Sequence, residues 1–243
     1  MTTVVHVIAG LGIGGAERIL VDVVRAQALR NYEIKVVNFL SDEGHAEDLR
    51  LMGVDVVSVG YRWRGGRVVG AIKGAFYLSR LFTQHKPDIV HTWLYSADVI
   101  GGLVAKIFGL RVIWGIFTGN IETQFLTWNT RVFFKLCARL SSFIPSAVVS
   151  VSASGRRSHI AAGYQQKKIY FVPTGFSIPE GPVEQQEGQY DFRDSRKVVI
   201  GMLGRISKEK DHDLLIRAVG QLQKDDFEVE LRLAGGIGIL ASR

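Results

Sequence analysis

The stretch Gly10-Leu-Gly-Ile-Gly-Gly-Ala-Glu-Arg18 decides the expected fold, because it joins a buried strand to a helix through a turn made largely of glycine. An apolar run at 4–9 precedes the stretch, and residues 16–29 continue it with apolar side chains at helical spacing. Glycine has no Cβ, so the backbone can turn sharply and come close to a ligand. The start of the helix adds unpaired N–H groups and the positive end of its dipole. Together these features predict an anion site, commonly for a phosphate group.

Short apolar runs alternate with amphipathic segments along the chain. Strands are predicted at 4–9, 34–40, 54–59, 88–91, 111–115, 147–151 and 169–172, and helices at 16–29, 45–52, 68–85, 97–108, 127–143 and 152–162. Strands that alternate with helices need right-handed crossovers, which place helices on both faces of one parallel sheet. The predicted fold is therefore α/β, with a doubly wound, Rossmann-like parallel sheet in the first domain.

The composition changes at residues 176–196, which are rich in proline, glycine, glutamine and charge. This segment is typical of a linker, so residues 1–175 are predicted to form the first domain. Residues 197–243 begin a second unit, with a strand at 197–203, a helix at 211–223 and a strand at 228–234. Two strands and one helix leave a parallel sheet uncovered. We therefore expect an incomplete second α/β domain: the chain is a fragment of a longer protein, or these residues pack onto the first domain.

The composition is that of a globular protein without a disulfide framework, since 47% of the 243 residues are hydrophobic and Cys137 is the one cysteine. The start of the chain has no basic and apolar leader, and no apolar run reaches the roughly 18–20 residues of a spanning helix. We therefore expect a cytoplasmic protein. The formal net charge of +7 favours anionic partners, among them nucleotides, nucleic acids and anionic membrane surfaces.

The glycine turn also fits the pattern Gly10-x-Gly12-x-x-Gly15 of dinucleotide-binding proteins. An acidic residue at the end of the second strand completes that pattern, because it binds the ribose hydroxyls. The chain has Asn38 there instead, so an NAD-dependent oxidoreductase is a weaker alternative. A tight turn that binds no ligand is a further alternative.

A second candidate phosphate site is the basic segment 201–211, which carries Arg205 and Lys210 between a predicted strand and a predicted helix. Arginine offers a fork of donors to phosphate oxygens, and lysine offers a mobile charge. In doubly wound folds, ligands bind at the carboxyl ends of the strands, where this segment lies. With the glycine turn, it predicts two α/β units that close on one anionic ligand; the alternative is a solvated basic loop.

Five motifs follow one another along the chain. They are Gly14-Gly-Ala-Glu-Arg18, Pro87-Asp-Ile-Val-His-Thr-Trp-Leu-Tyr-Ser-Ala-Asp98, Val148-Val-Ser-Val-Ser152 with Gly163-Tyr164, Val172-Pro-Thr-Gly-Phe176, and Gly204-Arg205 with Lys210-Asp-His212. In this order they resemble the retaining, nucleotide-sugar-dependent glycosyltransferases of family 4, which have the two-domain GT-B architecture. The resemblance implies transfer of a sugar from a nucleotide diphosphate sugar to a hydroxyl of a glycan or lipid-linked glycan. It implies no cofactor and no metal, the nucleotide sugar being a substrate.

The resemblance also implies roles for four residues. Gly14 and Gly15 would contact the donor pyrophosphate from the acceptor-side domain, and Arg205 and Lys210 would hold it from the donor domain. Negative charge builds on the leaving phosphate as the bond to the sugar breaks, and fixed cations and N–H groups stabilise that charge.

Glu17 and Asp98 are candidate contacts for the sugar or acceptor, with an ion-pair or helix-start role as the alternative for each. Many family members have a histidine in the loop after the fifth strand, where this chain has Phe117 and Thr118. Thr118 can donate a hydrogen bond to a ligand but offers no imidazole. We assign no catalytic residue, because the acidic pair of the family is expected beyond Gly235. The resemblance therefore implies a C-terminally truncated chain that is inactive alone.

Basic and aromatic residues occur together in 61–67, in the predicted helix 68–85 and in 131–139. Such segments suit an anionic membrane surface on the cytoplasmic side, the alternative being core helices with solvated arginines. The arginines are spread over several elements without a recognition motif, so no nucleic-acid partner is expected. The rival to a transferase is a non-catalytic fragment or binding module that holds an acceptor, a membrane surface or a partner.

Overall fold

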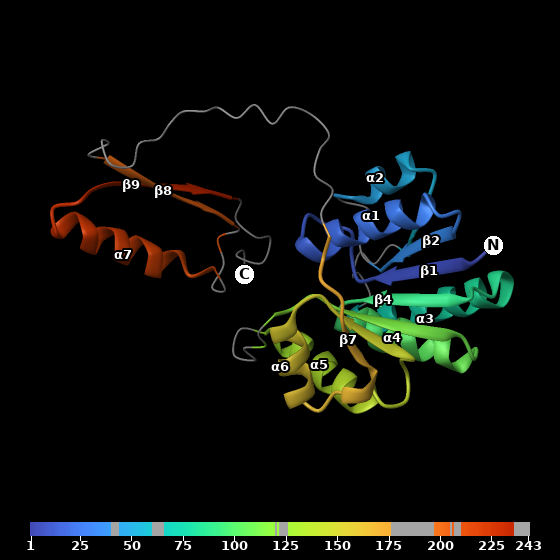
Figure 1. Ribbon diagram of the computed structural model, residues 1–243. Coiled ribbons are helices and arrows are strands. Elements are labelled where there is room, and N and C mark those ends of the chain that lie inside the picture. The colour runs from blue at the N-terminus through green and yellow to red at the C-terminus, as the bar shows by residue number, and fades with distance from the viewer. Residues whose placement is uncertain are drawn as a thin grey trace. The chain divides into compact units, whose positions relative to one another are not determined.

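In the computed structural model, the chain divides into two compact units, Met1–Ser177 and Ile178–Arg243 (Figure 1). The structure describes residues 1–39, 44–59, 66–119, 121, 126–175, 197–204, 206 and 210–235.

The first unit contains one seven-stranded sheet in which every strand pairing is parallel. The order across the sheet is β3-β2-β1-β4-β5-β6-β7. The strands are β1 (Thr3–Ile8), β2 (Glu33–Asn38), β3 (Asp55–Ser58), β4 (Ile89–Trp93), β5 (Arg111–Ile116), β6 (Ala147–Ser150) and β7 (Ile169–Phe171). The predicted doubly wound parallel sheet is confirmed. Boundaries differ from the predicted ones by up to three residues. For example, we expected a strand that ends at His91, whereas β4 continues to Trp93, which is 1% exposed.

Helices cover the sheet from both sides. They are α1 (Gly15–Ala28), α2 (Ala46–Leu51), α3 (Gly66–His85), α4 (Tyr95–Ile107), α5 (Trp128–Leu140) and α6 (Ala153–Ala161), with a short 3-10 turn, η2 (Gln166–Lys168). α1 and α2 pack on one face, and α3, α4 and α5 pack on the other (Figure 1). Within the described residues, no helix has the length and apolar content to cross a membrane.

The core consists of two apolar clusters separated by the sheet. Successive residues of a strand point to opposite faces, so Val7 of β1 packs toward α4, whereas Ile8 packs toward α1. The larger cluster includes the fully buried Trp114, and the smaller one the fully buried Leu20. Strands that are apolar on both faces are typical of a parallel sheet covered on both sides.

The second unit contains β8 (Lys197–Leu203), α7 (His212–Lys224) and β9 (Glu228–Ala234) in its described part. β8 and β9 are parallel neighbours. Asp211 precedes α7 with φ of 46°, and its side chain accepts a hydrogen bond from the Leu214 N–H at 3.3 Å. The sequence predicted these three elements within two residues.

Two histidines in the first unit are held neutral by burial. His6 receives a hydrogen bond from Trp93 Nε1 at its Nδ1 (3.1 Å), so its Nε2 carries the proton and donates to Gln27 Oε1 (2.8 Å). His159 donates from Nδ1 to the Gly155 carbonyl (2.7 Å), which leaves Nε2 to accept from the Tyr95 hydroxyl (3.0 Å). Desolvation lowers the pKa of His6 to about 4 and the pKa of His159 to about 4.

These shifts predict a loss of stability on acidification. A histidine whose folded-state pKa lies below its unfolded value stabilises the fold above pH 6.5, and loses that contribution as pH falls toward 4. Each such histidine contributes on the order of 3 kcal/mol. The slope of the unfolding free energy against pH reports how many protons are taken up on unfolding. Between pH 6.5 and 4.5, His159→Gln should take up about one proton fewer than the wild type, so its slope should be smaller.

Urea titrations followed by tryptophan fluorescence measure this, because all four tryptophans lie in the first unit. His85→Gln, at an exposed position, is the control and should keep the wild-type slope. Identical slopes for wild type and His159→Gln would contradict the neutral state of His159.

Candidate functional site

The strand order reverses between β1 and β4, which lie side by side although α1, β2, α2, β3 and α3 separate them in the chain. In open α/β sheets, ligands bind in the crevice outside the carboxyl ends of the strands at such a reversal. The glycine turn follows β1 and the segment from Leu94 follows β4, so both lie at this edge. The candidate site is therefore the carboxyl edge of β1, β4 and β5.

Gly14 and Gly15, which the sequence assigned to the donor phosphate, form the start of α1. Gly14 is the N-cap in an extended conformation, with no side-chain cap, and Gly15 is the first helical residue. A Cβ at Gly12 or Gly15 would meet no atom within 4 Å, so packing does not require glycine at either position. Open space beside a helix start leaves room for a ligand to approach the backbone N–H groups. The phosphate contact itself stays a prediction.

Glu17 folds back over the glycine turn. Its carboxylate lies so close to Gly14 that a Cβ there would collide with Oε2. A negative charge in the first turn of a helix is stabilised by the dipole, so Glu17 occupies the region where an incoming phosphate would place its own charge. The proposed contact of Glu17 with a sugar or acceptor stays a prediction.

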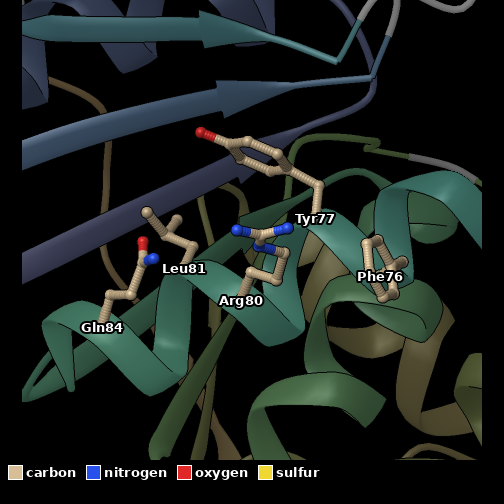
Figure 2. A pocket seen from close by; sticks show the side chains of 5 residues that line it. All are labelled: Phe76, Tyr77, Arg80, Leu81 and Gln84. Carbon is tan, nitrogen blue, oxygen red and sulfur yellow. The ribbon is translucent and has the colours of Figure 1, made fainter.

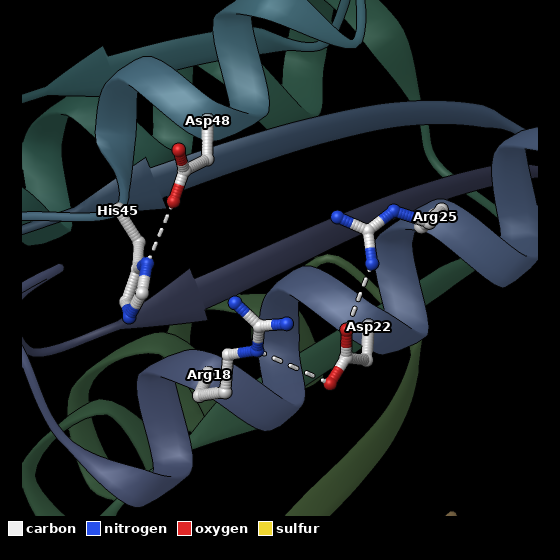
Figure 3. A network of polar contacts seen from close by, with 5 residues as sticks. All are labelled: Arg18, Asp22, Arg25, His45 and Asp48. Carbon is white, nitrogen blue, oxygen red and sulfur yellow. Dashed lines mark hydrogen bonds and ion pairs between the residues drawn. The ribbon is translucent and has the colours of Figure 1, made fainter. Parts of the chain in front are cut away.

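The glycine turn is held from the other side by the segment after β2, a contact that the sequence did not reveal. Gly44 has φ of 87°, and a Cβ there would lie 2.5 Å from the Leu11 carbonyl oxygen and 2.8 Å from Gly12 C. The His45 N–H donates to the same Leu11 carbonyl at 2.9 Å. Figure 3 shows His45 paired with Asp48 of α2, at 2.8 Å.

Asn38, the residue at the position of the acid in dinucleotide-binding proteins, is fully buried at the end of β2. Its amide nitrogen donates to Ser58 Oγ at 2.5 Å. The side chain therefore joins β2 to β3. An amide therefore stands where dinucleotide-binding proteins have the acid that binds the ribose hydroxyls.

An aromatic stack supports the loop after β5. The rings of Trp93 and Phe117 lie parallel, with centroids 4.6 Å apart and planes 6° apart. His91 packs against Trp93 at 4.6 Å, and burial lowers the pKa of His91 well below its usual value. Phe117, which stands where many family members have a histidine, is therefore a packing residue on Trp93. His91 lies within β4 and is likewise packed.

Thr118 takes part in a chain of hydrogen bonds. It bonds the Tyr95 hydroxyl, which in turn donates to His159 Nε2. Burial, the largest cause, raises the pKa of Tyr95 to about 12, so the phenol stays protonated. These hydrogen bonds tie the loop after β5 to the start of α4 and to α6. The Thr118 hydroxyl thus already has a partner, the Tyr95 hydroxyl. Its contact with a sugar or acceptor stays a prediction.

Asp98 is 1% exposed and points into the sheet. Its Oδ1 lies 2.5 Å from Thr92 Oγ1, which also lies 3.3 Å from the Ile113 carbonyl oxygen. Burial raises the pKa of Asp98 well above its usual value. The Thr92 hydroxyl is the donor to Asp98 Oδ1, and this hydrogen bond partly offsets the effect of burial on the pKa of Asp98. Asp98 thus joins α4 to β4 and β5, and a ligand would need the core to open to reach it.

Of the two predicted cations, Arg205 lies outside the described residues. Lys210 is exposed, and its aliphatic stem passes beside Gly204, whose added Cβ would lie 3.6 Å from Lys210 Cδ. Gly204 closes the end of β8 by donating to the Ala234 carbonyl at 2.9 Å. Lys210 therefore lies at the carboxyl end of β8, the edge where the sequence placed it. Its phosphate contact stays a prediction.

No group of three or more histidine, cysteine or acidic side chains is placed to hold a metal ion in the described part of the chain. A surface pocket of about 400 Å³ lies along α3, away from the carboxyl edge. Figure 2 shows its lining: Phe76, Tyr77, Arg80, Leu81 and Gln84.

The sequence from the glycine turn to the end of the first unit matches a known family. Residues 13–178 match the model of the family described as Glycosyltransferase Family 4. The chain belongs to this family. The resemblance drawn from the motifs is confirmed to that extent. No curated protein matches the chain.

Solved structures show the same fold in proteins of low sequence identity. HepE of Anabaena, in complex with UDP and glucose, is 19% identical with a TM-score of 0.71, over 98% of this chain and 62% of that one. The lipopolysaccharide outer core galactosyltransferase WaaB is 14% identical with a TM-score of 0.64, and the match covers 97% of this chain and 61% of WaaB. The UDP-GlcNAc 2-epimerase of Methanocaldococcus jannaschii is 13% identical with a TM-score of 0.56, over 96% and 65%.

The chain thus spans less than two thirds of the length of these proteins. Because transferases and an epimerase share the fold, the fold alone does not select the activity. The GT-B architecture of this family, with the Rossmann-like first domain, is the fold of the chain.

Replacing Gly44 tests how the glycine turn is held. Gly44→Ala should lower the free energy of unfolding by at least about 2 kcal/mol, because a Cβ meets the backbone of Leu11 and Gly12 and φ is positive. Gly53→Ala is the matched control: φ is 77°, but no atom lies within 4 Å of the added Cβ, so about 1 kcal/mol is expected. Urea unfolding followed by tryptophan fluorescence measures both. Equal losses would show that the contact with the turn carries no strain.

Replacing Glu17 distinguishes its two roles. Glu17→Gln should tighten binding of a nucleoside diphosphate about two- to fivefold, because a charge that opposes phosphate at the start of α1 is removed. Asp22→Asn, in α1 but paired with Arg18 and Arg25 (Figure 3), should change affinity little. Isothermal titration calorimetry with UDP measures both. Weaker binding by Glu17→Gln would instead support a direct contact of Glu17 with the ligand.

Proposed function

We propose that this chain is part of an enzyme that transfers a sugar from a nucleotide diphosphate sugar to a hydroxyl of a glycan or lipid-linked glycan, with retention at the sugar carbon. The observation that carries the proposal is the family match over residues 13–178. HepE, which has the same fold, was solved with UDP and glucose. A hexose donor and a cytoplasmic site of action belong to this proposal.

The glycine turn supports the donor side of the proposal. It lies at the reversal point of the sheet, with open space beside Gly15 and the positive end of α1 behind it. A diphosphate brought to this edge would meet backbone N–H groups already held in place at the start of α1, once the Glu17 carboxylate has moved aside. Such preorganised donors stabilise charge where it develops, on the leaving phosphate. Arg205 and Lys210 would supply cations from the second unit.

The acceptor side rests on fewer residues. Phe117 has no acid–base group and is stacked on Trp93, and the Thr118 hydroxyl is bonded to Tyr95, so the proposal gives neither residue the role of a base. The first unit therefore positions substrates, and the groups that complete the reaction would come from the second domain. A lipid-linked acceptor would bring the protein to a membrane surface, which is part of the proposal.

A binding module without turnover is the rival function, and nucleotide titration separates the two. UDP or GDP should bind the chain, and NADH should not. Arg205→Ala should weaken nucleoside diphosphate binding at least about tenfold, because charge-assisted hydrogen bonds to phosphate are lost. Lys224→Ala, which removes a cation from the last turn of α7, is the control and should bind like the wild type.

Binding that is unchanged in Arg205→Ala would remove the donor-phosphate assignment. A folded chain that binds none of the three nucleotides would favour the binding module. Calorimetry in solution, without lipid, gives both answers.

A further inference from the structure

The outer surface of the α3–α4–α5 layer exposes large apolar side chains. α4 packs between α3 and α5, and all three helices lie on the same face of the sheet. Phe76 of α3 is 65% exposed, Ile107 of α4 74%, Trp128 of α5 75%, and Phe143 just beyond α5 72%. One exposed apolar residue is ordinary, but several on adjoining helices mark a surface that meets another apolar phase.

The exposed apolar residues of α5 follow helical spacing. Trp128, Val132 and Leu136 are each four residues apart, so they share one side of the helix. Phe134 and Cys137 lie on the opposite side, in the core. α5 is thus apolar on its inner side and also along an outer stripe, and only the inner side is explained by the sheet.

Within the described residues of α3, α4 and α5, this outer surface carries basic side chains and no exposed carboxylate. Arg80, Lys106, Lys135 and Arg139 are exposed, and none of them forms an ion pair within the described residues. The one acidic residue of the three helices is Asp98, which is buried. We call this outer surface of α3, α4 and α5 the basic-apolar face.

The opposite layer is built differently. On α1, Arg18 and Arg25 both pair with Asp22 (Figure 3), and on α2, Arg50 pairs with Glu47. The sequence shows the same division. Residues 1–65 hold seven lysines and arginines and eight carboxylates. Residues 66–175 hold thirteen lysines and arginines but only three carboxylates. The net positive charge of the protein therefore comes from the half that includes α3, α4 and α5.

We propose that the basic-apolar face docks on an anionic lipid bilayer, which deepens the proposed function and rests on it for the lipid-borne acceptor. Unpaired cations attract any polyanion, and bases of a single-stranded nucleic acid can stack on Trp128 and Phe143. Neither a nucleic acid nor an acidic peptide, however, offers a continuous apolar phase that would also cover Ile107. An anionic bilayer offers both phases, charged headgroups for the cations and acyl chains for the apolar side chains. Lysine and arginine reach headgroups while their stems lie along apolar surface.

The face also extends to the site. Each helix that follows a parallel strand begins at the carboxyl edge, so α4 and α5 both start at the edge where the glycine turn lies. Trp128, the first residue of α5, is the exposed aromatic at that end. Tryptophan settles at the level of the headgroups. A bilayer on this face would thus bring a lipid-borne hydroxyl to the carboxyl edge of β4 and β5.

Vesicle co-sedimentation of the full 243-residue chain tests the proposal. Vesicles of phosphatidylcholine with 30% phosphatidylglycerol should bind the chain at least tenfold more tightly than pure phosphatidylcholine. Each cation near the surface contributes about fivefold to binding. The double variant Lys135→Ala with Arg139→Ala should therefore weaken binding at least about tenfold. Arg25→Ala with Arg50→Ala removes the same charge from the opposite layer and should leave binding unchanged.

Apolar variants test the other half of the face. Ile107→Ser with Trp128→Ser should weaken binding about fivefold or more. Leu29→Ser with Leu51→Ser, at positions 82% and 79% exposed beside α1 and α2, should leave it unchanged. Equal binding to neutral and anionic vesicles, or equal losses in the control variants, would overturn the proposal. The assay contains no nucleotide and the nucleotide titration contains no lipid, so each can fail while the other succeeds.

Discussion

A parallel sheet has to be covered on both faces, and the architecture of the first unit follows from that constraint. The strands are apolar on both sides, so helices must cross over alternately above and below. Once β1 has α1 on one face and β4 has α4 on the other, the order of strands reverses between them. The reversal brings the glycine turn and Trp93 to the same carboxyl edge, where such folds bind ligands. The site is therefore a consequence of how the sheet is covered.

The sequence predicted the elements well because hydrophobic periodicity is a local signal, present in every strand and helix. It placed Gly14 and Gly15 at the start of α1 for the same reason. It missed Gly44, because the need for glycine there comes from the backbone of Leu11, thirty-three positions earlier. The stack of Trp93 on Phe117 was missed in the same way, since the end of β4 and the loop after β5 meet only once β4 and β5 are paired.

Polar residues show the same limit from another direction. Asp98, Asn38 and His91 are all polar and lie in or near the end of a strand or the start of a helix, and of the three the sequence proposed only Asp98 as a ligand contact. In the structure, Asp98 and Asn38 bond to neighbouring strands, and His91 packs on Trp93. Burial decides between the two roles: a polar group inside must find an internal partner, and a group so engaged is not free for a ligand.

Coverage of the sheet accounts for the inner sides of α3, α4 and α5 but leaves their outer composition unexplained. A helix needs only polar groups on its outer side, and mixed charges keep a surface soluble, as on α1 and α2. Trp128, Ile107 and Phe143 work against solubility, and the absence of exposed carboxylates leaves the cations unbalanced. Neither feature stabilises the fold, so both point to something the surface meets. Because the same helices begin at the carboxyl edge, a surface that holds this face also fixes the direction from which an acceptor reaches the glycine turn.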